Sequence, residues 1–381
     1  MATGHSAAGV IEIREVRTRG DLRRFVAFPE RLYAGHPLYV PKLVGEELAA
    51  LSAARNPAFD YCEARCWMAF RDGEPVGRIA GIINHRYIET WGLKRARFGW
   101  IDFVDDPAVA AALLGQVEGW ARERGLDAVH GPLGFCDLDR EGMLVEGFDE
   151  MDLLITNYNH AYYPAHLERL GYRKDVDWIE FEVPVDGPLP PDIDRVSRVV
   201  LGRTGLRLLE TRSRRDLLPY VPEIFGLVND AYKGLYGVVE LSNRQIASYT
   251  KSFFGFINHE YVKLVLDGSG RVAAFGITMP SLSRALQTCR GRLFPFGFLH
   301  LLRALRHGDR LDLLLIAVRP ELQNKGVPAV IIHEIWKACR NHGIRHAETG
   351  PQLETNEKIN AMWTPFHPRQ HRRRRCFVKV L

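Results

Sequence analysis

The stretch LDLLLIAVRPELQNKGVPAVIIHEIWKAC, residues 311–339, decides the fold. Its first eight residues are nearly all apolar, which predicts a buried β-strand over 311–318. From Pro328 onward apolar residues recur at helical spacing, so a helix is expected over 328–340. A turn containing Gly326 joins the two elements. A strand, a tight turn and a helix in this order predict an α/β unit.

The same kind of unit occurs twice in the chain. Two β-rich runs, 66–70 and 76–83, flank the dipeptide Asp72-Gly73, which is a strong hairpin signal. Later, the runs 261–266 and 272–279 flank the sequence DGSG in the same way. Each predicted hairpin therefore marks the start of one copy of a repeated unit.

A further strand and a helix follow each predicted hairpin. In the first half these are 98–104 and 107–124, and in the second half they are the strand and helix of residues 311–340. Both helices are followed by a glycine, Gly125 and Gly343, as the C-terminal end of a helix prefers. The shared order predicts an internal duplication.

We therefore expect an α/β protein with mixed sheets, built as a tandem pair of similar lobes. The proline-rich segment DGPLPP, residues 186–191, disfavours regular structure and suits a linker. The expected lobes are residues 1–185 and 192–381. A chain of 381 residues is long enough for two hydrophobic cores.

The second half carries an insertion over residues 283–307. Its apolar residues are Leu293, Phe294, Phe296, Phe298, Leu299, Leu301, Leu302 and Leu305, beside Arg290, Arg292, Arg303 and Arg306. This composition suits a helix at a lipid–water interface or a wall for an acyl chain. A helix that only covers the sheet is the alternative.

The composition excludes several classes of protein. Hydrophobic residues at 46% and charged residues at 25% are ordinary for a soluble globular protein. The six cysteines lack the paired C-x2-C spacings of zinc sites, so we expect no metal and a reducing compartment. Residues 1–10 do not resemble a signal peptide, and no apolar run reaches the roughly 18 residues of a membrane span. We expect a cytoplasmic protein whose membrane contact, if any, is peripheral and on the inner face of the cytoplasmic membrane.

The turn before the second-half helix has the features of an anion site. Free N–H groups and the helix dipole favour a pyrophosphate at a helix N-terminus, and Lys325 adds a positive charge. The sequence QNKGVPA resembles motif A of the GCN5-related N-acyltransferases (GNATs), which wraps the pyrophosphate of coenzyme A. Pro328 stands where the motif usually has Gly or Ala. This departure removes one N–H donor or favours an acyl carrier protein in place of coenzyme A.

The GNAT resemblance implies a donor site for an acyl thioester. The strand residues whose backbone would hold the pantetheine are Ile316, Ala317 and Val318. The pyrophosphate would lie on Gln323, Asn324, Lys325, Gly326, Val327 and Ala329. Asn356 is placed like polar residues that reach the pantetheine arm or the substrate amine, and a helix N-cap is its alternative role. The expected donor is acyl-coenzyme A, with an acyl carrier protein as the other carrier.

The first half has Asp105-Asp106-Pro107 at the equivalent turn, where two carboxylates would repel a pyrophosphate. It has instead an acidic loop over residues 134–150. Candidates to bind an amine or act as its base are Asp137, Asp139 and Glu141. Candidates to protonate the leaving thiolate are Tyr158, His160 and Tyr163. The first lobe is therefore expected to hold the acceptor.

Longer matches narrow the resemblance. Residues 56–85, 130–150 and 354–379 look like a group of bacterial GCN5-like proteins that includes the bacterial ceramide synthases. The resemblance implies an acyltransferase that places a fatty acyl group on the amine of sphinganine or 3-ketosphinganine, giving a dihydroceramide or its keto form. The implied partner is a long-chain amino-alcohol lipid.

Two other functions stay open. A GNAT enzyme could act on a soluble amine, a peptide or an amino sugar, without an apolar channel. The run Arg369 to Arg375 could bind nucleic acid, although the mild net charge of +5 argues against it. The same arginines could contact anionic lipid or the phosphates of the donor, or form a solvated surface strand.

Overall fold

Both hairpins predicted from the Asp-Gly turns are present in the computed structural model, which describes residues 9–381. In the first half, β2 (Cys62–Arg71) pairs with β3 (Glu74–Asn84). Asp72 and Gly73 have φ angles of 51° and 81°, as a two-residue turn of this kind requires. In the second half, β9 (Val262–Leu266) pairs with β10 (Val272–Pro280).

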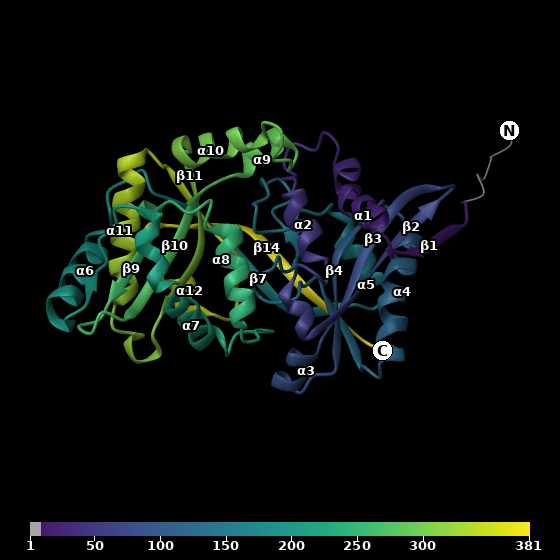
Figure 1. Cartoon of the computed structure of the whole chain (residues 1–381), viewed down its shortest axis with the longest axis horizontal. Coiled ribbons are helices and arrows are strands. Elements are labelled where there is room, and N and C mark those ends of the chain that lie inside the picture. The colour runs from purple at the N-terminus through teal and green to yellow at the C-terminus, as the bar shows by residue number, and fades with distance from the viewer. Residues whose placement is uncertain (1–8) are drawn as a thin grey trace.

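The two predicted strand–turn–helix units are also confirmed. They are β4 (Arg95–Phe103) with α4 (Pro107–Glu123), and β11 (Arg310–Val318) with α11 (Val327–His342). Each helix is followed by a strand that returns parallel to the first, β5 (Ala128–Gly131) and β12 (His346–Thr349). The fold is a mixed α/β sheet built from two lobes of the same topology (Figure 1).

Helices cover both lobes of the sheet, and Figure 1 shows α4 at one end of the molecule and α6 at the other. In the first lobe the remaining elements are β1 (Ile11–Glu15), α1 (Arg19–Leu32), α2 (Val44–Ala50), α3 (His85–Trp91), β6 (Met143–Glu146), α5 (Tyr162–Arg169) and β7 (Arg173–Pro184). In the second they are α6 (Pro191–Thr204), β8 (Arg207–Leu208), α7 (Val221–Tyr232), α8 (Asn243–Phe253), α9 (Ser283–Cys289), α10 (Gly297–His307), β13 (Gln352–Leu353), α12 (Glu357–Ala361) and β14 (Arg369–Val380).

Each lobe has an opening between two parallel strands. In the first lobe the register of β3 and β4 shifts between Arg78 and Ala80, and β4 pairs with β5 only over Arg95, Ala96 and Arg97. In the second, β10 and β11 shift between Ile277 and Thr278, and β11 pairs with β12 only as far as Leu313. A β-bulge bends its strand, so the later parts of β4 and β11 leave their neighbours.

The last strand of the chain joins the two lobes. β14 pairs along most of its length with β7 and also pairs with β5 and β6, all from the first half of the sequence. β7 in turn pairs with β12 and β13 of the second half. The result is one 14-stranded sheet, in which β14 runs through the middle of the molecule (Figure 1).

The C-terminal arginines are largely buried in this shared part of the sheet. Arg372 and Arg374 are 1% and 0% exposed, and their Nε atoms lie 2.7 and 2.5 Å from the two carboxylate oxygens of Glu180. Arg372 also contacts Glu348 at 2.6 Å. The expectation that these two arginines contact lipid, donor phosphates, nucleic acid or solvent is therefore wrong. The alternative of a solvated surface strand was right about the strand, but Arg372 and Arg374 pair with carboxylates inside the protein.

The insertion forms two helices, α9 and α10, on the upper side of the sheet in Figure 1. Leu286 and Leu301 are buried against Val40 and Met279, so the insertion does cover part of the core. Phe294, at 83% exposed, lies in the connection between the two helices. Within residues 9–381, every helix is too short or too polar to cross a membrane.

Candidate functional site

The predicted donor turn lies at the start of α11. Gly326 immediately precedes the helix with φ of 75°, a conformation that favours glycine, and Pro328 lies in the first helical turn. Gln323, Asn324 and Lys325 are exposed beside it. Because Gly326 has no side chain with which to cap the helix, its free N–H groups remain suited to an anion.

Helix α6 packs against this turn. A Cβ atom added to Gly326 would lie 2.7 Å from Val196 Cγ1 and 3.4 Å from Val200 Cγ2, both on α6. Gly326 therefore has a packing role in addition to its conformational one. A bulky side chain there would disturb the fold as well as any ligand, so Lys325 offers a cleaner test of donor binding.

The predicted pantetheine strand, β11, has a side-chain partner that the sequence did not reveal. The Tyr232 hydroxyl, at the end of α7, donates to the Ile316 carbonyl at 2.9 Å. Ala317 and Val318 continue the strand and are buried. Burial raises the pKa of Tyr232, and the carboxylate of Asp137 raises it further. The residues on either side of Asp137, Cys136 and Leu138, pack in the same hydrophobic cluster as Tyr232 and Ala317, so the acidic loop of the first lobe adjoins β11.

The acidic loop holds three carboxyl groups with different roles. Asp139 Oδ2 accepts from the backbone N–H groups of Phe135 and Cys136, at 2.7 and 3.3 Å, and so fixes the loop. Asp137 Oδ1 is buried without a hydrogen-bond partner among the described residues. Burial raises the pKa of Asp137 to about 6. Burial, together with the charge of Asp137, raises the pKa of Glu141 well above its ordinary value.

The two carboxyl groups are thus shifted to different extents: the pKa of Asp137 is raised to about 6, and the charge of Asp137 adds to the effect of burial on the pKa of Glu141. Pairs of carboxyl groups whose pKa values are separated by their environment are typical of acid–base sites. The buried Arg97 lies near both and lowers their pKa values in part, while its own guanidinium donates to the carbonyls of Gly134 and Gly237.

The three aromatic candidates lie in the first lobe, and the hydroxyls of the two tyrosines already have hydrogen-bond partners. Tyr163 is fully buried, and its hydroxyl accepts from the Phe103 N–H at 2.9 Å and contacts the Tyr33 hydroxyl at 3.0 Å. The Tyr158 hydroxyl donates to the Phe148 carbonyl at 2.9 Å. The His160 ring stacks between Tyr33 and Tyr162. These contacts give the three side chains a structural role in holding the lobe.

A cavity of about 710 Å³ lies at the opening of the first lobe. Its wall includes β4 residues 99–102, the acidic loop, α2 and α8. Apolar side chains in the wall include Leu43, Trp100, Ile101, Leu133, Leu138, Met143, Leu154, Ile155, Phe253, Phe256, Met279 and Leu293. Its volume lies within the roughly 300–1,000 Å³ typical of ligand pockets.

The cavity brings together only part of the predicted site. Asp139, Tyr158 and Tyr163 line it. The described residues of its wall do not include Asp137, Glu141, His160 or any residue of the donor segment 316–329. Asn356 lies at the N-terminus of α12, and its side chain makes no capping hydrogen bond to the described backbone. The acidic loop lies between the cavity and β11 of the second lobe. Its Asp139 lines the cavity, and its Cys136 packs in the same cluster as Ala317.

Sequence reasoning missed the residues that cross between the lobes. Tyr249, on α8, lines the cavity and places its hydroxyl 3.0 Å from Cys136 Sγ of the acidic loop. Within the first lobe, Lys42, Glu47 and Arg140 also line the cavity, where Lys42 pairs with Asp152 and Arg140 pairs with Glu47. Single tyrosines and lysines carry no motif, and more than a hundred residues separate Tyr249 from the loop that it contacts.

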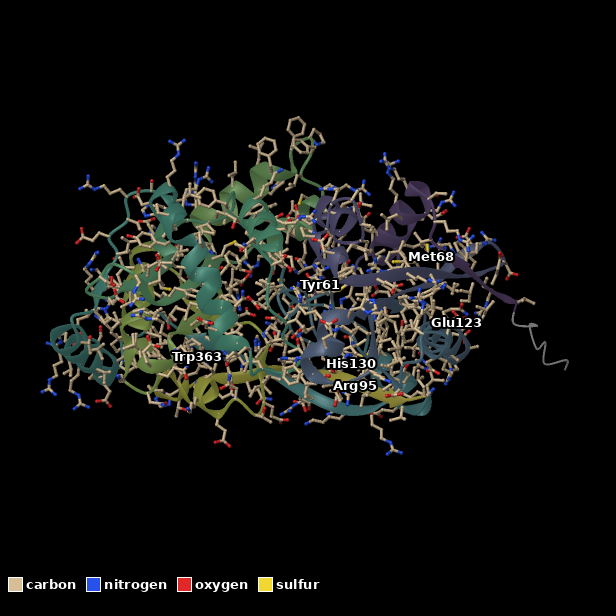
Figure 2. The ribbon with its side chains drawn as sticks, turned by 60° about the horizontal axis from the view of Figure 1, so that its bottom comes forward. Tyr61, Met68, Arg95, Glu123, His130 and Trp363 are labelled. Atoms are coloured by element: carbon tan, nitrogen blue, oxygen red, sulfur yellow. The ribbon has the colours of Figure 1, made fainter. Side chains whose placement is uncertain are left out.

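A second cluster of polar side chains has the residue types of a metal site but fits a hydrogen-bond network better. His130, Asp175 and Cys376 offer ligand atoms within 4.8 Å of one another. The Tyr236 hydroxyl already donates to Asp175 at 2.5 Å and contacts His130 Nδ1 at 2.9 Å, and Arg95 pairs with the same Asp175 oxygen at 2.7 Å. Figure 2 labels His130 and Arg95 close to each other. A guanidinium at this oxygen opposes a cation, so the cluster fits a hydrogen-bond network.

Comparison with known proteins agrees with this architecture. No protein-family model matches the chain. Protein YghO of Escherichia coli (strain K12) is 29% identical over 376 residues, covering 97% of this chain and 95% of YghO. Bacterial ceramide synthase of Caulobacter vibrioides is 30% identical over 298 residues, covering 78% of this chain and 77% of that protein. A solved tandem GNAT protein from the clavulanic acid biosynthesis pathway matches with a TM-score of 0.57 at 12% identity, over 97% of this chain and 98% of that chain.

The duplicated hairpin–strand–turn–helix order and the match to a tandem GNAT protein define the fold as a tandem pair of GNAT-like lobes. The expected fold is thereby confirmed. Within that fold class, the chain belongs to the family of the bacterial ceramide synthase of Caulobacter vibrioides, and it is an N-acyltransferase.

Proposed function

We propose that this enzyme transfers a fatty acyl group from acyl-coenzyme A to the amine of a sphingoid base, sphinganine or 3-ketosphinganine. The observation that carries the proposal is the cavity of about 710 Å³, whose wall combines many apolar side chains with charged ones and which is bounded by the acidic loop. An apolar chain and an ammonium group are the two parts of such a substrate, and the cavity and the loop offer a complementary environment for each. The similarity to a bacterial ceramide synthase supports the same substrate class.

The proposal divides the work between residues 1–185, for the acceptor, and residues 192–381, for the donor. The donor's pyrophosphate would lie on the turn from Gln323 to Ala329 at the start of α11, where N–H groups and Lys325 favour an anion. Its pantetheine would follow β11 from Val318 towards Ile316. Acyl carrier protein is the alternative carrier, and it would place the same phosphopantetheine arm along β11.

In the proposed reaction the amine attacks the thioester directly. The ammonium of the acceptor pairs with Asp137 and loses a proton to it. The nitrogen then forms a bond to the carbonyl carbon, and the carbon–sulfur bond breaks. The second proton that the nitrogen gives up passes to the leaving thiolate, so the products are the amide and the free thiol. Asp137, whose pKa burial raises to about 6, would accept the first proton of the ammonium, and Glu141, whose pKa is raised well above its ordinary value, would be the neighbouring acid. Tyr232 would hold β11 in place through Ile316.

The proposal also places the enzyme in the cytoplasm, at the inner face of the cytoplasmic membrane, where a long-chain amine is dissolved in lipid. The alternative acceptor, a soluble amine, peptide or amino sugar, needs no such location. The charged pairs in the cavity wall leave room for a polar acceptor, so the two substrate classes have to be compared directly.

The test is a reaction with purified protein, palmitoyl-coenzyme A and either sphinganine or 3-ketosphinganine, followed by mass spectrometry of the amide. Glucosamine serves as the soluble acceptor, and palmitoyl-acyl carrier protein as the second donor. We expect the lipid amide, and its loss in Asp137→Asn but not in Asp149→Asn, a change at an exposed carboxylate of the same loop. Acylation of glucosamine in preference to both lipid amines would refute the proposed substrate.

A further inference from the structure

The connection between α9 and α10 exposes an unusual group of large apolar side chains. Phe294 and Phe296 are 83% and 69% exposed, and Phe298, Leu299 and Leu302 follow at 38%, 51% and 45%. We call residues 290–306, with these side chains, the aromatic tip. Large exposed apolar residues gathered on one segment mark an interaction surface, whereas single ones scattered over a surface do not.

The charge of the aromatic tip indicates what it contacts. Residues 283–308 contain no Asp or Glu. Arg284, Arg290, Arg303 and Arg306 are exposed on the segment, and Arg292 pairs with Glu30 at 2.9 Å. Exposed phenylalanines beside arginines are the composition of segments that lie in the interface of an anionic bilayer.

The tip is fixed to the wall of the cavity. The Val44 N–H, at the start of α2, donates to the Gly291 carbonyl at 3.1 Å. A Cβ atom added to Gly291 would lie 2.0 Å from the Lys42 carbonyl oxygen, so the two backbones are in close contact. Leu293, which immediately precedes Phe294, lines the cavity. Apolar surface therefore continues from the cavity wall to the exposed tip.

A second region adjoins the same edge of the cavity. Phe253, at the end of α8, is 41% exposed and lines the cavity. Phe256 lines it as well and packs in the same hydrophobic cluster as Leu293. The cavity thus has apolar, partly exposed residues from two elements at the side that the tip occupies.

We propose that the aromatic tip docks onto an anionic lipid bilayer and places the adjoining side of the cavity at the lipid surface. The docking itself needs only the tip. Its consequence, that the long-chain acceptor enters the cavity directly from the bilayer, rests on the function proposed above. A bilayer accommodates both features of the tip, because phenylalanines enter the acyl region while arginines stay at the headgroups.

Other occupants match the tip less well. In a symmetric contact with a second copy, the same arginines would face one another and repel. An acidic carrier protein would suit the arginines but would leave Phe294 and Phe296 without an apolar partner. Both remain distinguishable outcomes of the experiment.

The experiment is co-sedimentation of the full-length protein with vesicles of phosphatidylcholine alone or with one quarter phosphatidylglycerol. The test variants are Phe294→Ser with Phe296→Ser, and Arg303→Glu with Arg306→Glu. The control is Val199→Ser with Leu218→Ser, two exposed apolar residues far from the tip in sequence. We expect the wild type and the control to bind anionic vesicles, and each test variant to lose at least tenfold in apparent affinity while its melting temperature stays unchanged.

Several results would overturn the proposal. They are wild-type protein that binds neither vesicle, a control that loses as much binding as the test variants, or a dimer or carrier-protein complex that depends on the tip while vesicle binding does not. Failure of the proposed function is a separate result. Vesicle binding that depends on the tip, without amide formation from a detergent-dissolved sphingoid base, would reject the lipid substrate and leave the docking surface in place.

Discussion

The two lobes differ most clearly at the turn that precedes their central helix. In the first lobe Asp106 caps α4, with its carboxylate accepting from the Ala108 N–H at 2.7 Å and pairing with Arg71 at 2.5 Å. In the second lobe the same position is held by Gly326, which offers no side chain to α11. One helix N-terminus is capped by a side chain of its own chain, and the other has no side-chain cap. A duplicated fold can thus keep its geometry while the two copies differ in how suited this turn is to an anion.

The lobes also differ in the space beside these helices, and here it is the first lobe that has room for a ligand. The opening of the first lobe borders the cavity of about 710 Å³. In the second lobe the Tyr232 hydroxyl reaches the Ile316 carbonyl on β11. The first lobe therefore has space without a glycine turn of this kind, and the second has the turn beside a strand that a tyrosine holds in place. This contrast is the physical basis on which we propose the division between acceptor and donor.

The largest effect is expected from separating the two lobes. A chain ending at residue 368 lacks β14, which leaves the edges of β5 and β7 without their partner. We expect no soluble, cooperatively melting protein from this truncation. A cooperative thermal transition by circular dichroism, with the wild-type midpoint, would show that the fold does not depend on β14.

The acid–base role of the first lobe can be tested at Asp137. Asp137→Asn removes the proposed base, and loss of a general base typically costs about 10²- to 10⁴-fold in rate. Because the pKa of Asp137 is raised to about 6 and the ionised form is the active one, wild-type kcat/KM should rise with pH and level off above that value. Initial rates between pH 5 and 8 give the profile. A wild-type rate independent of pH in this range would contradict the role.

The buried ion pairs that join the lobes should contribute strongly to stability. Glu180→Gln leaves Arg372 and Arg374 without their shared carboxylate, and breaking a buried pair costs about 3–5 kcal/mol in the free energy of unfolding. Burial by itself raises the pKa of Glu180, but the two guanidiniums lower it by more, so the net pKa lies below its ordinary value. The stabilising contribution of Glu180 is therefore lost as the pH falls through that lowered pKa. Urea unfolding measures the effect. Glu74→Gln, in an exposed pair with Arg31, is the control and should change little.

The same Asp137 should also reduce stability. Its raised pKa means that the folded state disfavours the ionised carboxylate, so the penalty is present above about pH 6 and disappears below the ordinary value near 4. Asp137→Asn should therefore stabilise the protein by about 3 kcal/mol at pH 7.5, and by less at pH 5. Urea unfolding at both pH values, with Asp149→Asn as the control, measures this difference. Equal stabilisation at both pH values would mean that the charge is not the cause.

Local signals in the sequence predicted most of the fold. The Asp-Gly dipeptides fix the hairpins through their own backbone preferences, and the apolar spacing of residues 328–340 fixes a helix wherever the chain places it. The resemblance of QNKGVPA to motif A placed the turn correctly between β11 and α11. The division at residues 186–191 and the roles assigned to the site residues stay predictions.

The remaining features depend on contacts between distant residues. The pairing of β14 with β7 joins residues about 200 positions apart, and a row of arginines gives no sign that Glu180 will neutralise two of them. The packing of Val196 on Gly326 and the contact of Tyr232 with Ile316 arise in the same way. Such contacts follow from how the lobes are arranged, which a single sequence does not encode in any local pattern.

The division between a donor lobe and an acceptor lobe is tested most directly by titration calorimetry of coenzyme A binding to three variants. Lys325→Glu places a negative charge in the donor turn, and Lys337→Glu makes the same change at an exposed site further along α11. Asp137→Asn changes a first-lobe residue that lies outside the donor turn. We predict that Lys325→Glu weakens binding roughly tenfold, a difference of about 1.4 kcal/mol, while the other two variants bind as the wild type does. Wild-type affinity in Lys325→Glu, or an equal loss in Asp137→Asn, would contradict the division.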